Sequence, residues 1–243
     1  MADVSPIYGP VTSRRLGRSL GISLVPRKAC PYDCIHCTLG PTTDLTIERG
    51  GHISPDNVIR ALRERLSVLE AKGEKIDAIT IAGFGEATLD SRLGEVEALI
   101  RRETRLPVAL LTSGGLLADP LVSRETARFD IVMAYLHAGG PEAFQHVHRP
   151  HRDVRFDDVY AGLSRLAREI GGELWLEVMV CRGVTDDDRE LDALAERIQA
   201  IDPGKVHIDT PTAPRVRHLA VSRERLSALA RRIGERTEVI APP

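Results

Sequence analysis

Short apolar runs alternate with amphipathic segments along most of this 243-residue chain, and this alternation constrains the fold more than any other feature. The apolar runs are rich in aliphatic residues at successive positions, as parallel strands covered by helices are. The segments between them place Leu, Val and Ile at helical spacing, and the first follows the helix-start sequence Ser54-Pro55-Asp56. The pattern predicts strands over 20–25, 76–82, 108–112, 131–136, 174–180 and 206–209, with a late seventh over 238–240. It predicts helices around 55–69, 93–100, 159–166, 191–198 and 226–233.

About six β/α units fit this length, which places the chain in the α/β class. Crossovers between parallel strands are right-handed, and the carboxyl ends of the strands are where such folds place their chemistry. We therefore expect a partial or complete β/α barrel. A doubly wound open sheet is the alternative, because the pattern alone does not separate the two architectures.

Composition narrows the class of protein. Hydrophobic residues make up 42% of the chain and the formal net charge is -2, which predicts a globular protein and argues against a strongly basic nucleic-acid binder. The first residues lack a signal-peptide pattern, and no apolar run is long enough to span a bilayer. We expect a cytoplasmic protein with no membrane partner, in which four cysteines serve metal or catalytic chemistry more than disulfides.

Three of the four cysteines fall in the segment 28–37, with the spacing C-x3-C-x2-C, directly after the first predicted strand. They are Cys30, Cys34 and Cys37. Three thiolates on one loop suit an iron–sulfur cluster or zinc. A structural zinc site needs a fourth ligand, for which His36, His52 and the distant Cys181 are candidates. A [4Fe–4S] cluster on three cysteines leaves one iron open for a substrate, and we favour this reading while zinc remains the alternative.

This motif is the signature of the radical S-adenosylmethionine (SAM) superfamily, which the chain resembles. Gly83-Phe84-Gly85-Glu86, after the second predicted strand, looks like the glycine-glycine-glutamate motif of that superfamily. Thr112-Ser113-Gly114, after the third, is similar to its Thr-Asn-Gly turn. Further segments resemble a short Fe–S oxidoreductase subgroup related to wyosine-type tRNA-modifying enzymes. These segments are 8–10, 13–21, 148–151, 175–179 and 209–211.

The resemblance implies a partial (β/α)6 barrel and a single domain over 1–243, with an N-terminal extension (1–19), a β/α core (20–210) and a C-terminal helix and tail (211–243). It implies a [4Fe–4S] cluster on the three cysteines, with the amino and carboxylate groups of SAM on the fourth iron. Reductive cleavage of SAM would give a 5′-deoxyadenosyl radical. The residues expected to contact SAM are His36, Gly83, Gly85, Glu86, Ser113, Tyr135 and His137. Glu86 would bind the SAM ammonium, and the two glycines would let the cofactor approach the backbone.

The substrate and the catalytic residues that act on it are unknown at this stage. The short chain favours a small molecule over RNA, and the electron donor would be a reductant such as a flavodoxin or ferredoxin. His36 stands where relatives carry an aromatic residue, and Tyr135 and His137 stand where the subgroup has Ser and Asp. These departures keep open an alternative: an iron–sulfur or zinc protein with a structural or regulatory role and no SAM cleavage.

Three features remain outside this scheme. The histidines of 145–151 could form a second metal site or an ordinary polar loop. The arginines of 14–18 could bind an anion or lie on a solvated surface. Cys181 is expected to be a small buried apolar residue.

Overall fold

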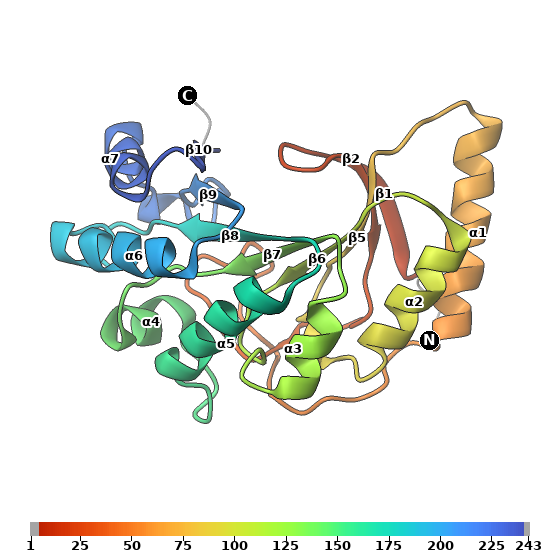
Figure 1. Ribbon diagram of the computed structural model, residues 1–243, viewed down its shortest axis with the longest axis horizontal. Coiled ribbons are helices and arrows are strands. Elements are labelled where there is room, and N and C mark those ends of the chain that lie inside the picture. Colours follow the sequence, from red (N-terminus) through yellow and green to blue (C-terminus); the bar gives the residue numbers. More distant parts are fainter. Residues whose placement is uncertain (1–4, 241–243) are drawn as a thin grey trace.

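The computed structural model describes residues 5–240 and is built on one eight-stranded sheet (Figure 1). Its strand order is β1-β2-β5-β6-β7-β8-β9-β10, and every neighbouring pair is parallel except the antiparallel pair β1 and β2. The strands are β1 (Ile7–Ser13), β2 (Gly17–Ile22), β5 (Ala78–Ile81), β6 (Val108–Thr112), β7 (Ile131–Tyr135), β8 (Glu173–Met179), β9 (Lys205–Asp209) and β10 (Thr237–Val239). A separate two-stranded sheet pairs β3 (Ala29–Cys30) with β4 (Asp44–Leu45).

The parallel strands follow one another in chain order, with no reversal along the sheet. A doubly wound sheet requires such a reversal, so that alternative is wrong. Six strands in order, β2 and β5 to β9, make the α/β core of a partial barrel, as expected. No backbone pairing joins the two edge strands β1 and β10 within residues 5–240.

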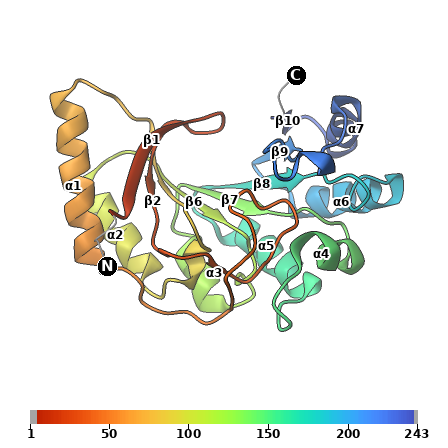
Figure 2. The same cartoon turned by 180° about the vertical axis from the view of Figure 1, so that it is seen from behind.

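Helices cover the outer face of the curved sheet, as the two opposite views show (Figures 1 and 2). They are α1 (Pro55–Ala71), α2 (Leu93–Glu103), α3 (Pro120–Thr126), α4 (Pro141–His148), α5 (Phe156–Glu169), α6 (Asp188–Ile201) and α7 (Arg223–Ile233), with short 3-10 turns η1 (Ala87–Leu89) and η2 (Arg217–Leu219). Helix α1 begins at Pro55 after Ser54, as predicted, although the Ser54 side chain makes no capping hydrogen bond. None of the helices within residues 5–240 has the length and apolarity that crossing a membrane requires.

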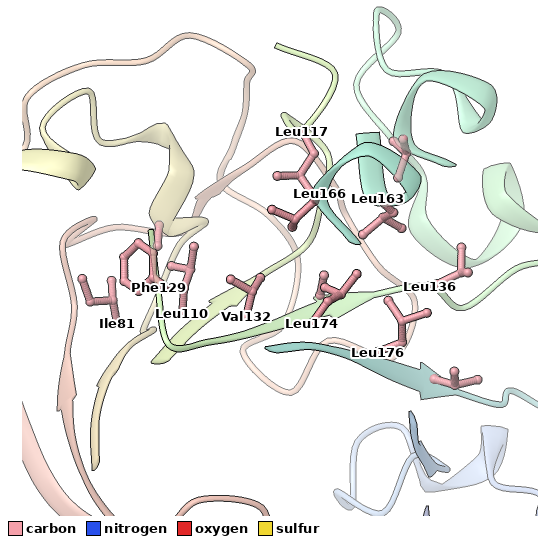
Figure 3. Close-up of a cluster of buried hydrophobic side chains, with 14 of the residues drawn as sticks. Ile81, Leu110, Leu117, Phe129, Val132, Leu136, Leu163, Leu166, Leu174 and Leu176 are labelled. Carbon is pink, nitrogen blue, oxygen red and sulfur yellow. The ribbon is translucent and has the colours of Figure 1, made fainter. Parts of the chain in front are cut away.

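The core lies between the sheet and these helices. Leu110, Val132 and Leu174 on successive strands pack toward Leu163 and Leu166 of α5 (Figure 3). All five side chains are at most 2% exposed. Their burial stabilises the packing of the sheet against the helices. The carboxyl ends of the strands lie outside this core and can carry functional groups.

The strand β1 is a correction to the sequence reading, which expects no strand before residue 20. Strands β1 and β2 form a hairpin whose tip, residues 13–17, extends toward the opposite edge of the sheet (Figure 1). Arg15 at the tip places Nη2 2.5 Å from Glu177 Oε2 on β8, and Arg14 donates to the carbonyl oxygen of Ile240 beyond β10. Side chains of the hairpin therefore connect the two edges that backbone pairing leaves apart.

Candidate functional site

All ten residues predicted to bind the cluster or SAM line one cavity of about 530 Å³. The cavity lies mainly at the carboxyl ends of β5 to β9, where the fold is expected to place its chemistry. Its walls include the three cysteines, both glycines and Glu86, and the side chains of His36, Ser113, Tyr135 and His137. Segments that lie far apart in the sequence therefore meet at one cavity.

The cysteine loop is held in place by the end of helix α4. The backbone N–H of Asp33 donates to the carbonyl of His148 at 2.9 Å, and that of Ile35 donates to the carbonyl of Val147 at 3.0 Å. Cys34 Sγ lies 3.2 Å from His148 Nδ1. The three cysteines are half-buried and free of disulfides, so their sulfur atoms are available as ligands.

Burial disfavours the thiolate form of Cys30 and Cys34 in the absence of a metal. It raises the pKa of Cys30 to about 12, with the nearby charge of Glu86 as a further cause, and it raises the pKa of Cys34 well above its usual value. A metal ligand must be a thiolate, so assembly of a metal centre has to expel these protons. Within residues 5–240, no three His, Cys, Asp or Glu side chains converge closely enough to hold a single metal ion.

Glu86 ties the ends of β5 and β6 together. Its Oε1 accepts from Thr88 Oγ1 at 2.7 Å, from Thr88 N at 3.1 Å and from Thr112 Oγ1 at 2.6 Å. Within residues 5–240, its Oε2 accepts only from Ser113 N, at 2.6 Å. Glu86 is 5% exposed and lines the cavity. Since a carboxylate oxygen can accept two hydrogen bonds, Oε2 retains capacity for one more donor.

The two glycines of 83–86 lie in close contact with other parts of the chain. Gly83 has φ +146°, and a Cβ there would collide with the Ser23 side chain. A Cβ on Gly85 would lie 2.6 Å from the carbonyl oxygen of Ala29 and 2.7 Å from that of Arg27. Other parts of the chain lie where a Cβ on either glycine would be. The turn that carries Glu86 therefore packs directly against the neighbouring segments, which include the cysteine loop.

Replacing Gly85 with alanine should separate these two segments. We expect the free energy of unfolding to fall by about 1–3 kcal/mol, the usual cost of overpacking a tight site, together with a lower iron content after reconstitution. Urea unfolding and iron analysis measure both effects. Gly50→Ala is the matched control, because nothing lies within 4 Å of a Cβ added there. Equal behaviour of the two variants would refute the role assigned to Gly85.

The rings of His36, Tyr135 and His137 form another wall of the cavity, and the ring of His148 packs against that of His137 outside the cavity lining. The ring of His137 lies 5.0 Å from those of both Tyr135 and His148, and 4.8 Å from that of His36. Burial lowers the pKa of His36 to about 4 and holds the pKa values of His137 and His148 well below their usual range. The rings are therefore neutral near pH 7, and this wall suits a flat heteroaromatic ligand.

The tautomer of His137 follows from its backbone contact. Met179 N donates to His137 Nδ1 at 3.1 Å, so the proton of the neutral ring sits on Nε2. His148, from the segment 145–151, is 1% exposed and packs against Tyr32 and Phe144. Among the described residues, no group of three possible metal ligands includes a histidine of this segment.

Lys28, which the sequence analysis does not single out, lines the cavity beside the cysteines. Its Nζ is buried and has no hydrogen-bond partner within residues 5–240. A buried ammonium without a partner is costly, and an anionic group in the cavity would remove this cost. The residues present therefore fit an anionic cluster and the carboxylate of a bound cofactor.

A second charged group in the cavity wall joins three elements that the sequence leaves apart. Arg15 meets Glu177 of β8, and Glu177 Oε1 lies 2.8 Å from His207 Nδ1 on β9. Asp209 Oδ2 lies 3.9 Å from Arg15 Nη2 and 3.4 Å from Arg14 Nη2. The signal for the two acids was their position inside otherwise apolar strands. Cys181, in contrast, is fully buried outside the cavity, and burial raises its pKa to about 12.

Residues 24–195 match the profile of the radical SAM superfamily. The UPF0026 protein MJ1312 of Methanocaldococcus jannaschii is 35% identical over 208 residues, which cover 85% of this chain and 64% of that protein. A Brachyspira hyodysenteriae protein named GTPase Obg is 35% identical over 206 residues, 85% of this chain and 30% of that protein. The chain thus spans less than two thirds of the length of either relative.

Among solved structures, that of TYW1 shares the fold with a TM-score of 0.68 at 15% identity. The match covers 89% of this chain and 72% of TYW1. At this level of identity the likeness concerns the arrangement of strands and helices, and it agrees with the partial barrel described above.

Proposed function

This chain belongs to the radical SAM superfamily, and from that membership we propose that Cys30, Cys34 and Cys37 hold a [4Fe–4S] cluster at which SAM is cleaved reductively. Enzymes of this superfamily bind a [4Fe–4S] cluster and SAM as cofactors. When bound, the cluster supplies the electron that breaks the sulfonium S–C5′ bond, which gives a 5′-deoxyadenosyl radical that abstracts hydrogen from a substrate. The observation that carries the proposal is the shared cavity of the three free thiols and Glu86.

The chain's own residues bind and orient the cofactor. Glu86 accepts a hydrogen bond from the SAM ammonium through Oε2, the oxygen with remaining capacity. Lys28 provides the positive charge for the SAM carboxylate, since its ammonium is buried without a partner in the described part of the chain. Ser113 N–H is occupied by Glu86, so Ser113 contributes through its hydroxyl. Gly83 and Gly85 act on the site by holding the Glu86 turn in place.

We assign the nucleoside part of SAM to the ring wall of the cavity, which His36, Tyr135 and His137 form. The neutral ring of His36 packs against adenine, as an aromatic residue does in relatives, whereas both faces of the His137 ring are covered by Tyr135 and His148. His137 donates from Nε2 to a ribose hydroxyl, because Nδ1 is held by the backbone of Met179. Tyr135 and His137 thereby replace the Ser and Asp of the subgroup.

Enzymes of this superfamily need an external reductant. For this chain we propose a flavodoxin or ferredoxin as the electron donor. We propose that the reaction is of the oxidoreductase type and takes place in the cytoplasm. The proposed substrate is a small molecule rather than RNA. A cavity of about 530 Å³ that must also hold the cofactors leaves room for a small substrate. We further propose that 1–243 acts as a single functional domain.

The test is anaerobic. Protein reconstituted with iron and sulfide, reduced with dithionite and mixed with SAM should release 5′-deoxyadenosine, which mass spectrometry detects. Metal analysis should find iron and acid-labile sulfide. One zinc without sulfide would support the structural alternative instead, and a fully loaded, reduced protein that never consumes SAM with candidate substrates would refute the proposal.

A further inference from the structure

We infer that Arg15, Glu177 and Asp209 form the substrate subsite, and that its substrate carries an ammonium and a carboxylate close together, as amino acids do. The inference rests on the proposed function, because it assigns a substrate to a cavity whose other part would hold the cluster and SAM. It adds the chemical class of a substrate that the fold and the cysteine motif leave open.

The three side chains face one cavity from three separate elements. Arg15 comes from the tip of the β1–β2 hairpin, Glu177 from β8 and Asp209 from β9. Their side chains are 22%, 9% and 12% exposed. Arg15 Nη2 lies 2.5 Å from Glu177 Oε2 and 3.9 Å from Asp209 Oδ2. A surface ion pair would be more exposed and would need only two partners, so this group is a built feature of the cavity wall.

The group has hydrogen-bonding capacity that the described residues leave unused. Arg15 Nε is buried without a partner, and the guanidinium contacts carboxylates through Nη2 alone. Asp209 Oδ1 accepts from Thr210 N at 2.8 Å, and Oδ2 has only the long contact with Arg14 at 3.4 Å as a hydrogen bond. The group therefore offers both a free donor of positive charge and a free acceptor of negative charge.

Charge complementarity selects among ligands. A carboxylate on Arg15 Nε and an ammonium on Asp209 Oδ2 would satisfy both free groups with charge-assisted hydrogen bonds. A phosphate ester would satisfy Arg15 but would add one or two negative charges beside two carboxylates. A neutral sugar would bring no charge of either sign to Arg15 Nε or to Asp209 Oδ2. An amino acid is the class that fits.

Tyr135 places this group beside the proposed SAM site. It lines the same cavity, and it stands opposite Glu177 in the pairing of β7 with β8. Its ring stacks on that of His137 at 5.0 Å, so Tyr135 contacts both the acid of β8 and the ring wall. A substrate bound by Arg15 and Asp209 would lie next to the nucleoside end of the cofactor, which is where a radical on C5′ must meet it.

The binding experiment uses reconstituted protein with SAM and no reductant, so that nothing turns over. Saturation-transfer NMR screens the twenty standard amino acids and four nucleoside monophosphates. Calorimetry then measures the dissociation constant of the strongest amino acid and of its N-acetyl and carboxamide derivatives. We expect at least one amino acid to bind, and both derivatives to bind about 30-fold more weakly, as when a buried charge pair loses one partner.

Variants assign the two contacts. Arg15→Gln should weaken binding of the intact amino acid about 30-fold and leave binding of its carboxamide derivative unchanged. Asp209→Asn should weaken binding of the intact amino acid by a similar factor and leave binding of its N-acetyl derivative unchanged. The matched control is Arg18→Gln, on the same hairpin, because Arg18 pairs with Glu74 and does not line the cavity. This control should bind the amino acid as the parent protein does.

The outcomes separate this inference from the proposed function. Absorbance of the cluster and calorimetric SAM binding are recorded on the same samples. Intact cluster and SAM binding with no amino acid bound, or with affinity unchanged in Arg15→Gln, would overturn the subsite and leave the proposed function standing. Binding of nucleotides in place of amino acids would overturn the substrate class. Absence of cluster and SAM binding would instead refute the proposed function itself.

Discussion

Replacing Cys34 with alanine should remove the [4Fe–4S] cluster and reduce 5′-deoxyadenosine formation at least about 100-fold, whereas replacing Cys181 should preserve both. Cys34 lines the cavity together with Cys30 and Cys37, so its loss leaves only two thiolates for the irons. Cys181 is fully buried elsewhere. The absorbance of the reconstituted cluster, iron and sulfide analysis, and mass spectrometry of the nucleoside products measure the effects.

Two controls make the cysteine result specific. Thermal unfolding of both variants before reconstitution should stay close to that of the parent chain, because a cysteine-to-alanine change removes one sulfur atom and creates little cavity. Cys30→Ala and Cys37→Ala should behave as Cys34→Ala does. A cluster that survives in Cys34→Ala, or one that is lost in Cys181→Ala, would show that the ligand set is misassigned.

The sequence was informative about the core strands and less so about their ends. The prediction for 108–112 coincides with β6 (Val108–Thr112), where an apolar run is bounded by Pro107 and a turn. The prediction 20–25 overshoots β2 (Gly17–Ile22), because Leu24 and Val25 are buried at 1% exposure after the chain has left the sheet. Apolar character reports burial, and it does not distinguish a strand from a buried loop.

The hairpin strand β1 was missed for a related reason. It is an antiparallel edge strand with Pro10 in its middle and mixed exposure along its length, so it lacks the apolar run of the core strands. Its position at the edge leaves one face half solvated. No periodicity of sufficient length marks such a segment.

The candidate site likewise contains some features that the sequence reveals and others that it does not. The cysteines and the 83–86 turn have local spacing, and spacing is visible in a sequence. The contacts of Arg15 with Glu177 and of Cys34 with His148 join segments far apart in the chain, and only the folded sheet brings them together. The sequence analysis did not single out the acids inside strands, and their residue type does not indicate which partner each has.

Replacing Glu86 with alanine should lower the free energy of unfolding by about 3 kcal/mol and the affinity for SAM at least about 30-fold. Four donor contacts from Thr88, Thr112 and Ser113 end on this carboxylate, and all of these groups are buried. Their donors would lose their partner together, and the ends of β5 and β6 would separate. Chemical denaturation and calorimetry with SAM measure the two losses.

Glu86→Gln and Glu97→Gln separate the structural from the binding role of the carboxylate. In Glu86→Gln the amide nitrogen must replace either Oε1, with its three contacts, or Oε2, which Ser113 N and the SAM ammonium need, so SAM affinity should still fall at least about 30-fold. Glu97 is 1% exposed and pairs with Arg101 and Arg128 away from the cavity. Glu97→Gln should therefore reduce stability while SAM affinity is unchanged. If the two glutamine variants lose SAM affinity equally, Glu86 acts only through stability and does not contact the cofactor.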